Sequence, residues 1–166
     1  MIDVRRIKKI SRIREKQAAS DIDGKRHAFS GALWYKKGDV GSNGFLMEDK
    51  FTEKDFFSVK LSILKKIEKE ALCVLKIPVL RIGFLNNGKS EDYAILRFKD
   101  CIFLELTPAE IGNKNSYRLT AEHARESYLS NDRPMITFSI GNFFYIIMEW
   151  SEFVESRNKI LSGERL

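Results

Sequence analysis

Two carboxylates and one ammonium group are spaced so that they meet on a short hairpin. Asn43-Gly44 is a dipeptide typical of a two-residue β-hairpin turn. With that turn, Asp39 lies directly opposite Glu48 on the paired strand. Lys50 points to the same face as Glu48, because side chains alternate along a strand. The spacing therefore predicts a cluster of Asp39, Glu48 and Lys50.

The chemistry that suits such a cluster is metal-assisted hydrolysis. Opposed carboxylates destabilise a strand pair unless a cation neutralises them. Mg²⁺ binds through one or two carboxylates, keeps several waters and takes phosphate oxygens from a substrate. An ion held in this way activates a water and stabilises the charge that develops on phosphorus. Lys50 would lower the pKa of that water or bind the attacked phosphate. The pattern favours phosphodiester hydrolysis with Mg²⁺ or Mn²⁺, since both ions suit oxygen ligands.

An exposed hairpin with a salt bridge is the structural alternative, because acid-x-Lys patterns arise by chance in a charged chain. Asp23-Gly24-Lys25 fits the same pattern outside the hairpin. The hairpin register favours the functional interpretation, because it gathers all three side chains on one face beside a basic segment.

Basic residues are concentrated in the first quarter of the chain. The net charge is +6, and residues 1–40 hold eleven basic against five acidic side chains. Such a segment indicates a polyanionic partner, most simply nucleic acid, and a solvated basic surface is the alternative. The residues predicted to bind DNA are Arg5, Arg6, Lys8, Lys9, Arg12, Arg14, Lys25, Arg26, Lys36 and Lys37.

Apolar spacing and turn residues predict the elements that position the hairpin. Apolar side chains recur at helical spacing in two segments, and short apolar runs bounded by Gly, Pro and Asn indicate strands. In chain order the sequence predicts a helix over 6–21, the hairpin over 38–51, a helix over 56–75, and strands over 79–84 and 93–98. This order is typical of an α/β domain with a mixed sheet.

The C-terminal third repeats this pattern weakly. A predicted helix over 120–130 precedes two apolar runs, 134–140 and 143–153, that resemble the two strands before them. We divide the chain into a core over 1–105 and an α+β extension over 106–166. The extension is either a degenerate copy of the core's helix-strand-strand half or an unrelated pair of strands. Its apolar side chains require a partner surface, on the core or across a dimer.

The stretch from Ser11 to Phe84 resembles the archaeal-type Holliday junction resolvases, which belong to the restriction-endonuclease-like superfamily with its PD-(D/E)xK motif. The resemblance covers a little under half of the chain and does not include residues 106–166. It implies a restriction-endonuclease-like mixed β-sheet core flanked by helices. The matching pieces, in order, are Glu15, HAFSGA at 27–32, KGDV at 37–40, FLMEDKF at 45–51 and IPVLRIGF at 77–84.

The resemblance implies roles for the hairpin residues. Asp39 and Glu48 resemble the metal-binding acids of the family, and the backbone carbonyl of Asp49 resembles a further ligand. Lys50 resembles the catalytic lysine. The proline expected before the first acid is Gly38 here, a departure that the family tolerates.

Two further residues are implied outside the hairpin. Glu15 resembles the helix glutamate that completes the acidic site, as both a catalytic residue and a metal ligand, although Asp21 on the same predicted helix is an alternative. Ser30 resembles a catalytic serine in a loop that approaches the scissile phosphate, and a plain turn residue is the alternative.

The function implied by the resemblance is resolution of four-way (Holliday) junctions in DNA by paired nicks. Cleavage of two strands needs two active sites, so the implied partners are branched DNA and a second copy of the chain, with Mg²⁺ as cofactor. Two alternatives stay open. One is another duplex nuclease of the superfamily, such as a restriction enzyme or a repair nickase. The other is a non-catalytic basic nucleic-acid-binding module whose acids are structural.

Cysteine usage and hydropathy indicate the compartment. Cys73 and Cys101 lie in apolar stretches without metal-binding spacing, which is typical of buried free thiols in a reducing compartment. No apolar run approaches the roughly 18 residues of a membrane span. We therefore expect a cytoplasmic, nucleoid-associated protein without a membrane partner.

Overall fold

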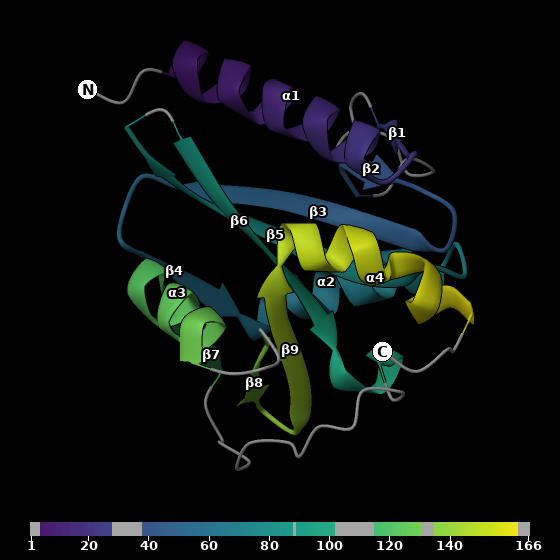
Figure 1. Ribbon diagram of the computed structural model, residues 1–166. Helices are drawn as coiled ribbons and strands as arrows, with labels where there is room; N and C mark the ends of the chain where they lie inside the picture. Colours follow the sequence, from purple (N-terminus) through teal and green to yellow (C-terminus); the bar gives the residue numbers. More distant parts are fainter. Residues whose placement is uncertain (1–3, 28–37, 88, 102–114, 131–134, 163–166) are drawn as a thin grey trace.

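The computed structural model describes residues 4–27, 38–87, 89–101, 115–130 and 135–162 (Figure 1). The helices are α1 (Val4–Asp21), α2 (Leu61–Leu72), α3 (Ala121–Ser130) and α4 (Trp150–Ser162), with a 3₁₀ turn at Phe98–Cys101. The strands are β1 (Lys25–Arg26), β2 (Val40–Gly41), β3 (Phe45–Thr52), β4 (Phe56–Lys60), β5 (Ile77–Asn86), β6 (Lys89–Arg97), β7 (Ser116–Thr120), β8 (Met135–Ile140) and β9 (Phe143–Glu149). The α/β fold predicted from the sequence, with a mixed sheet flanked by helices, is confirmed.

Seven strands form the main sheet, in the order β1-β2-β3-β5-β6-β9-β8, and β4 pairs with β7 in a separate two-stranded sheet. β3 and β5 run parallel, because β4 and α2 carry the chain back between them. The other pairings of the main sheet are antiparallel. β3, the strand that carries Glu48 and Lys50, thus lies between the short hairpin strand β2 and the long strand β5 (Figure 1).

The hairpin forms in the predicted register. β2 pairs with β3 through Val40 and Met47, and the Ser42 N–H donates to the Phe45 carbonyl across the Asn-Gly turn at 3.0 Å. Gly44 has a φ of +80°, a left-handed conformation that glycine adopts without a Cβ penalty. The turn chemistry read from the sequence therefore sets which side chains of the two strands face each other.

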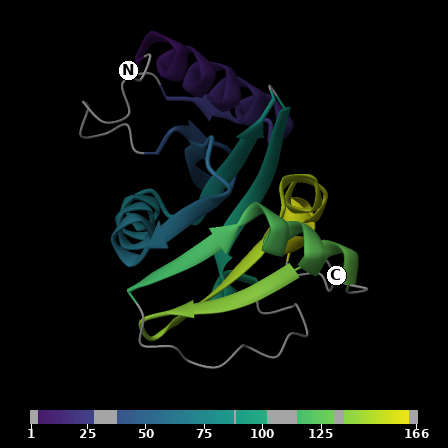
Figure 2. The same cartoon turned by 90° about the vertical axis from the view of Figure 1, so that its left-hand side faces the viewer.

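An apolar core lies on each face of the sheet. One core includes Ala18 of α1 and Phe153 of α4, and the other includes Leu64 of α2. Figure 2 shows α2 and α4 on opposite sides of the sheet. Because β3 is buried between these layers and its side chains alternate, the neighbours Glu48 and Asp49 face different helices.

Two segments differ from the sequence prediction. Residues 56–60, predicted as the start of a helix, form β4 and pair with residues 116–120 of β7. Residues 150–153, predicted as the end of a strand, begin helix α4. Tertiary packing selects both structures: β4 gains a partner far along the chain, and Trp150 and Phe153 at helical spacing are buried against the sheet.

The C-terminal extension packs on the core, as its apolar side chains predicted. β9 pairs with β6 inside the main sheet, and β8 follows at its edge. α2-β5-β6 and α3-β8-β9 share a helix-strand-strand order and meet at the β6–β9 pair (Figure 1). This arrangement is the one that the degenerate-copy hypothesis requires, and the hypothesis stays a prediction.

Within the described residues, none of the helices combines the length and apolar character needed to cross a bilayer. Cys101 is a buried free thiol, as predicted. The prediction of burial is wrong for Cys73, which is exposed because it lies at the C-terminal end of α2.

Candidate functional site

The structure brings Asp39, Glu48 and Lys50 together on one side of the hairpin. The Lys50 ammonium donates to Glu48 Oε1 at 2.6 Å. Asp39 precedes β2, and its Oδ2 accepts a hydrogen bond from the Asp49 backbone N–H at 2.8 Å. The Asp39 N–H also donates to the Met47 carbonyl at 2.8 Å, which continues the strand pairing beyond Val40. The Asp39 carboxylate therefore lies within electrostatic range of Glu48 and Lys50.

The site concentrates negative charge. Burial raises the pKa of Asp39 above its ordinary value, and the charges of Glu48 and Glu15 raise it further, against the Asp49 N–H and Lys50, which lower it. Burial lowers the pKa of Lys50, but its hydrogen bond and attraction to Glu48 outweigh that effect, so the pKa is raised. Lys50 is therefore a charged donor at neutral pH, and the acids repel one another.

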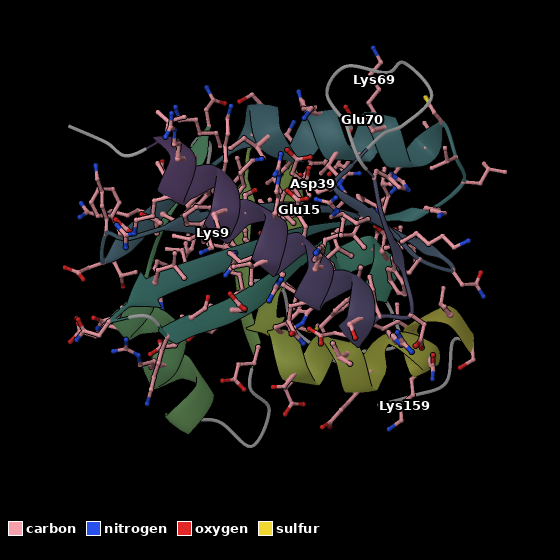
Figure 3. The ribbon with its side chains drawn as sticks, turned by 90° about the horizontal axis from the view of Figure 1, so that it is seen from above. Lys9, Glu15, Asp39, Lys69, Glu70 and Lys159 are labelled. Carbon is pink, nitrogen blue, oxygen red and sulfur yellow. The ribbon has the colours of Figure 1, made fainter. Side chains whose placement is uncertain are left out.

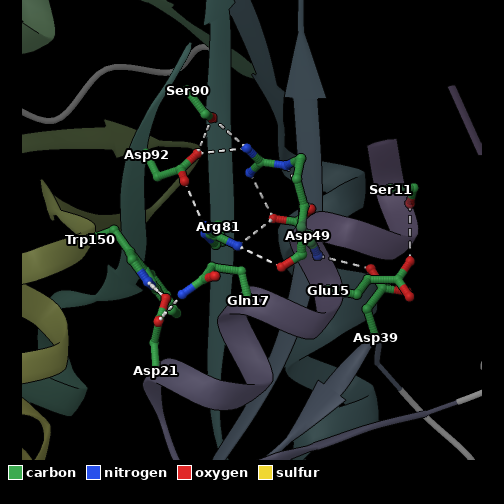
Figure 4. A network of polar contacts seen from close by, with 11 residues as sticks. Ser11, Glu15, Gln17, Asp21, Asp39, Asp49, Arg81, Ser90, Asp92 and Trp150 are labelled. Carbon is green, nitrogen blue, oxygen red and sulfur yellow. Dashed lines mark hydrogen bonds and ion pairs between the residues drawn. The ribbon is translucent and has the colours of Figure 1, made fainter. Parts of the chain in front are cut away.

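Of the two candidate acids on α1, the structure places Glu15 at the site. Figures 3 and 4 show Glu15 and Asp39 side by side. Glu15 accepts hydrogen bonds from Ser11 at 3.0 Å and from Arg26 at 3.4 Å. Asp21 points away, because it accepts hydrogen bonds from Gln17 and from the Trp150 indole, each at 2.7 Å.

Helix α2 adds two residues that the sequence interpretation missed. The Lys66 ammonium lies 3.3 Å from Glu48 Oε1, and Glu70 accepts the Gly38 N–H at 3.2 Å. Lys66 and Glu70 lie one helical turn apart and form a longer ion pair at 4.0 Å. Their polar stripe beside the apolar face of α2 was visible in the sequence, but nothing local indicated that it faces the hairpin.

Among the described residues, the carboxylates of the site offer a divalent ion at most an adjacent pair of protein ligands. Glu48 and Glu15 are each hydrogen-bonded to cationic side chains. Across the described residues, no three acidic, imidazole or thiol groups are close enough to hold an ion. Asp39 and Glu48 are adjacent and their charges repel, although Glu48 also pairs with Lys50 and Lys66. Mg²⁺ binds through one or two protein carboxylates when substrate phosphate supplies further oxygens.

A buried network of two arginines and two aspartates lies on the opposite face of β3 (Figure 4). Arg14 of α1 donates to both carboxylate oxygens of Asp49 at 2.9 Å and to Asp92 at 2.7 Å. Arg81 of β5 donates to Asp92, lies 3.6 Å from Asp49 and stacks on the Trp150 ring. Burial raises the pKa of Asp92, but Arg81 and Arg14 outweigh it, so its pKa is lowered and the carboxylate stays charged.

This network fixes the helix to the sheet next to the site. Arg14 precedes Glu15, and Asp49 lies between Glu48 and Lys50, so one ion pair holds both chain segments. A Cβ at position 83 would clash with the Arg14 guanidinium, because that side chain lies directly on Gly83 of β5. From the sequence, Arg14 was predicted to contact DNA and the Asp49 backbone carbonyl to bind the metal. Nothing in the sequence indicated that their side chains form an ion pair.

The predicted DNA-binding residues divide into buried, exposed and ion-paired groups, and two of them lie outside the described residues. Arg14 is 5% exposed, so the structure corrects its placement on a DNA-binding surface, because desolvated ion pairing holds it inside. Lys8, Lys9, Arg12 and Lys25 are exposed, whereas Arg6 pairs with Glu53 at 2.8 Å and Arg26 with Glu15. Arg5 is exposed at the start of α1. Ser30, Lys36 and Lys37 lie outside the described residues.

We expect Arg14→Met to lower the free energy of unfolding by about 3–5 kcal/mol, because it leaves Asp49 and Asp92 buried with one cation fewer. Urea denaturation followed by circular dichroism measures the change. Arg12→Met on the exposed face of α1 is the matched control and should change stability by less than about 0.5 kcal/mol. Equal stability of the two variants would show that the network contributes nothing.

Comparison with known proteins adds no assignment. No protein-family model matches the chain, and no curated protein matches it at a significant level.

Proposed function

We propose that this protein is a metal-dependent DNA endonuclease that introduces paired nicks into four-way junctions. The observation that carries the proposal is the meeting of Asp39, Glu48 and Lys50 on the hairpin, with Glu15 supplied by α1. The resemblance to the junction resolvases assigns roles to these same four residues. Separate parts of the chain, in helix α1 and in the β2–β3 hairpin, contribute them to one place.

Each residue has a role that follows from its position. Asp39 and Glu48 would hold Mg²⁺, which when bound supplies an activated water and neutralises charge on the attacked phosphate. Lys50 is a charged donor directed at Glu48, so it would bind a phosphate oxygen placed beside that carboxylate. Glu15, held by Ser11 and Arg26, would orient the attacking water through a hydrogen bond.

Exposed cations on α1 support DNA as the substrate. Lys8, Lys9 and Arg12 are exposed along the helix that carries Glu15, so phosphates that reach the site would pass close to them. Cleavage of two strands at one junction requires two sites, so the proposal includes a homodimer and a nucleoid-associated, cytoplasmic setting.

A non-catalytic DNA-binding protein is a second candidate, and one observation favours it. Glu48 is bonded to both Lys50 and Lys66, an arrangement that a purely structural ion-pair cluster also forms. In that case the basic surface binds DNA and the acids only stabilise the hairpin.

The experiment that separates the candidates is incubation of purified protein and Mg²⁺ with a labelled four-way junction, a linear duplex and a single strand. Nicking of the junction alone supports the resolvase. Cleavage of all duplex substrates points to a different nuclease of the superfamily. DNA that is shifted on a gel and stays intact points to the binding module.

Neutralising the exposed cations of α1 should weaken DNA binding without moving the cleavage position. The plot of log K against log salt has a negative slope. In the triple variant Lys8→Gln, Lys9→Gln and Arg12→Gln, each lost phosphate contact should reduce the magnitude of that slope by about 0.9. Fluorescence anisotropy over a salt series measures this slope. A wild-type slope in the variant would show that α1 does not touch DNA.

A further inference from the structure

A basic cavity of about 720 Å³ lies at the C-terminal end of α2, apart from Glu48 and Lys50. Its polar wall carries several lysines and one arginine, and its apolar wall is formed by the end of α2 and the start of β5. The residues that matter for its charge are Lys65, Lys69, Lys76, Arg97, Lys99, Glu68 and Asp100.

The two acids of this cavity interact with Arg97 and Lys99. Glu68 pairs with Arg97 at 2.8 Å and accepts the Tyr145 hydroxyl at 2.9 Å. Asp100 is attracted to Lys99 and Arg97, and burial raises its pKa. Within the part of the chain that the structure describes, Lys65 and Lys69 form no ion pair.

Lys99 adds an exposed cation to the cavity wall, beside Asp100. Lys76 also lines the cavity, although its ammonium lies against Gly41 of the hairpin. The cavity therefore keeps an excess of positive charge directed into one volume, which attracts an anion more strongly than separate surface lysines do.

Helix geometry connects this cavity to the candidate site. Lys65 and Lys69 lie four residues apart and share one stripe of α2, while Lys66 and Glu70 share the neighbouring stripe that contacts Glu48 and Gly38. Figure 3 shows Glu70 on the side of α2 nearer to Asp39, with Lys69 pointing outward. A polyanion that leaves the site along α2 would meet Lys66 first and the cavity lysines next.

The apolar wall distinguishes the ligand class. Leu72 and Leu75 line the cavity and are 73% and 89% exposed, beside Ile77 and Pro78. A DNA backbone presents phosphates that the lysines would bind and sugar faces that pack on apolar side chains. A free phosphate ion would use the lysines alone and leave this wall in water.

We propose that the α2 cavity, lined by Lys65, Lys69, Lys76 and Lys99, is a second DNA-backbone docking surface that holds a duplex arm leaving the candidate site. This inference rests on the proposed function, because it concerns the same DNA substrate. It extends DNA contact from the α1 cations, of which Arg6 is paired and Arg14 is buried, to a surface that the N-terminal concentration of basic residues did not indicate.

The test compares two triple variants by fluorescence anisotropy with a labelled four-way junction, without Mg²⁺, between about 50 and 200 mM salt. The cavity variant carries Lys65→Gln, Lys69→Gln and Lys99→Gln, all at exposed positions. The matched control carries Lys54→Gln, Lys89→Gln and Lys159→Gln, which are also exposed and do not line the cavity. In the cavity variant the magnitude of the slope of log K against log salt should fall by up to about 2.7, because each lost phosphate contact reduces it by about 0.9.

The remaining outcomes separate this inference from the proposed function. Equal slopes in the two variants, with junction cleavage by the wild type intact, would overturn the docking surface and leave the nuclease proposal standing. A wild-type protein that does not bind the junction would overturn both. A second experiment titrates the wild type and the cavity variant with inorganic phosphate at constant ionic strength. If phosphate binding is lost in the cavity variant while DNA binding is unchanged, the cavity is a small-anion site and the proposal fails.

Discussion

Asp39→Asn is expected to lower the rate of junction cleavage by about two to four orders of magnitude, the range typical of a lost group that acts on the reacting atoms. The asparagine side-chain oxygen still accepts the Asp49 N–H, so the hairpin keeps its geometry. Binding rests on basic contacts to phosphate, so the dissociation constant for the junction should stay within a few fold. Single-turnover cleavage and anisotropy measure the two quantities.

The same variant should keep or gain thermal stability, with a defined pH dependence. The folded state raises the pKa of Asp39 above its ordinary value, so ionisation of this group opposes folding. That cost is absent below pH 3.8, appears as the pH rises and is complete above the raised pKa. The melting temperature of Asp39→Asn relative to wild type should therefore be higher at neutral pH than in acid.

Asp55→Asn is the matched control, because Asp55 is exposed and its side chain has no part in the site. It should cleave at the wild-type rate. Cleavage by Asp39→Asn within a few fold of wild type would refute the site assignment, whatever its stability.

Deletion of residues 106–166 is expected to give an insoluble or strongly destabilised protein. The deletion removes β9, which pairs with β6 inside the sheet, and exposes the β6 edge. It also removes fully buried side chains, among them Tyr145, Ile146 and Phe153. Burial of four such side chains contributes about 6–12 kcal/mol, which is comparable with the net stability of a whole domain.

Soluble yield and the urea midpoint of the fragment 1–105 measure this effect. A milder truncation ends at residue 162 and removes none of the described strands or helices, so it serves as the control. A soluble fragment 1–105 that cleaves the junction would show that the extension is an independent accessory module.

The hairpin could be predicted because its determinants are local. Asn43-Gly44 selects the turn, the turn sets the register, and strand alternation then places Asp39 and Glu48 on one face. The helix over 6–21 and the strands β5, β6 and β8 followed equally from apolar periodicity and turn residues. These elements need no knowledge of which segments become neighbours.

The missed features depend on pairings far apart in the chain. Residues 56–60 were predicted as helix from their local sequence. They form strand β4 because they pair with β7, which lies far along the chain. Arg14 read as a surface cation because its charge is visible in the sequence, whereas its partners Asp49 and Asp92 are distant. Lys66 at the site was missed for the same reason, since the packing of α2 against the hairpin is a tertiary contact.

The most direct test of the central claim is mapping of nicks on a four-way junction labelled on each strand in turn, with and without Mg²⁺. If Asp39, Glu48 and Lys50 form a hydrolytic centre that acts in a dimer, wild-type protein should give paired nicks at symmetric positions in two opposing strands. The nicks should require Mg²⁺ and be absent with Asp39→Asn. A junction that is bound by the wild type in Mg²⁺ and stays uncut would contradict the account.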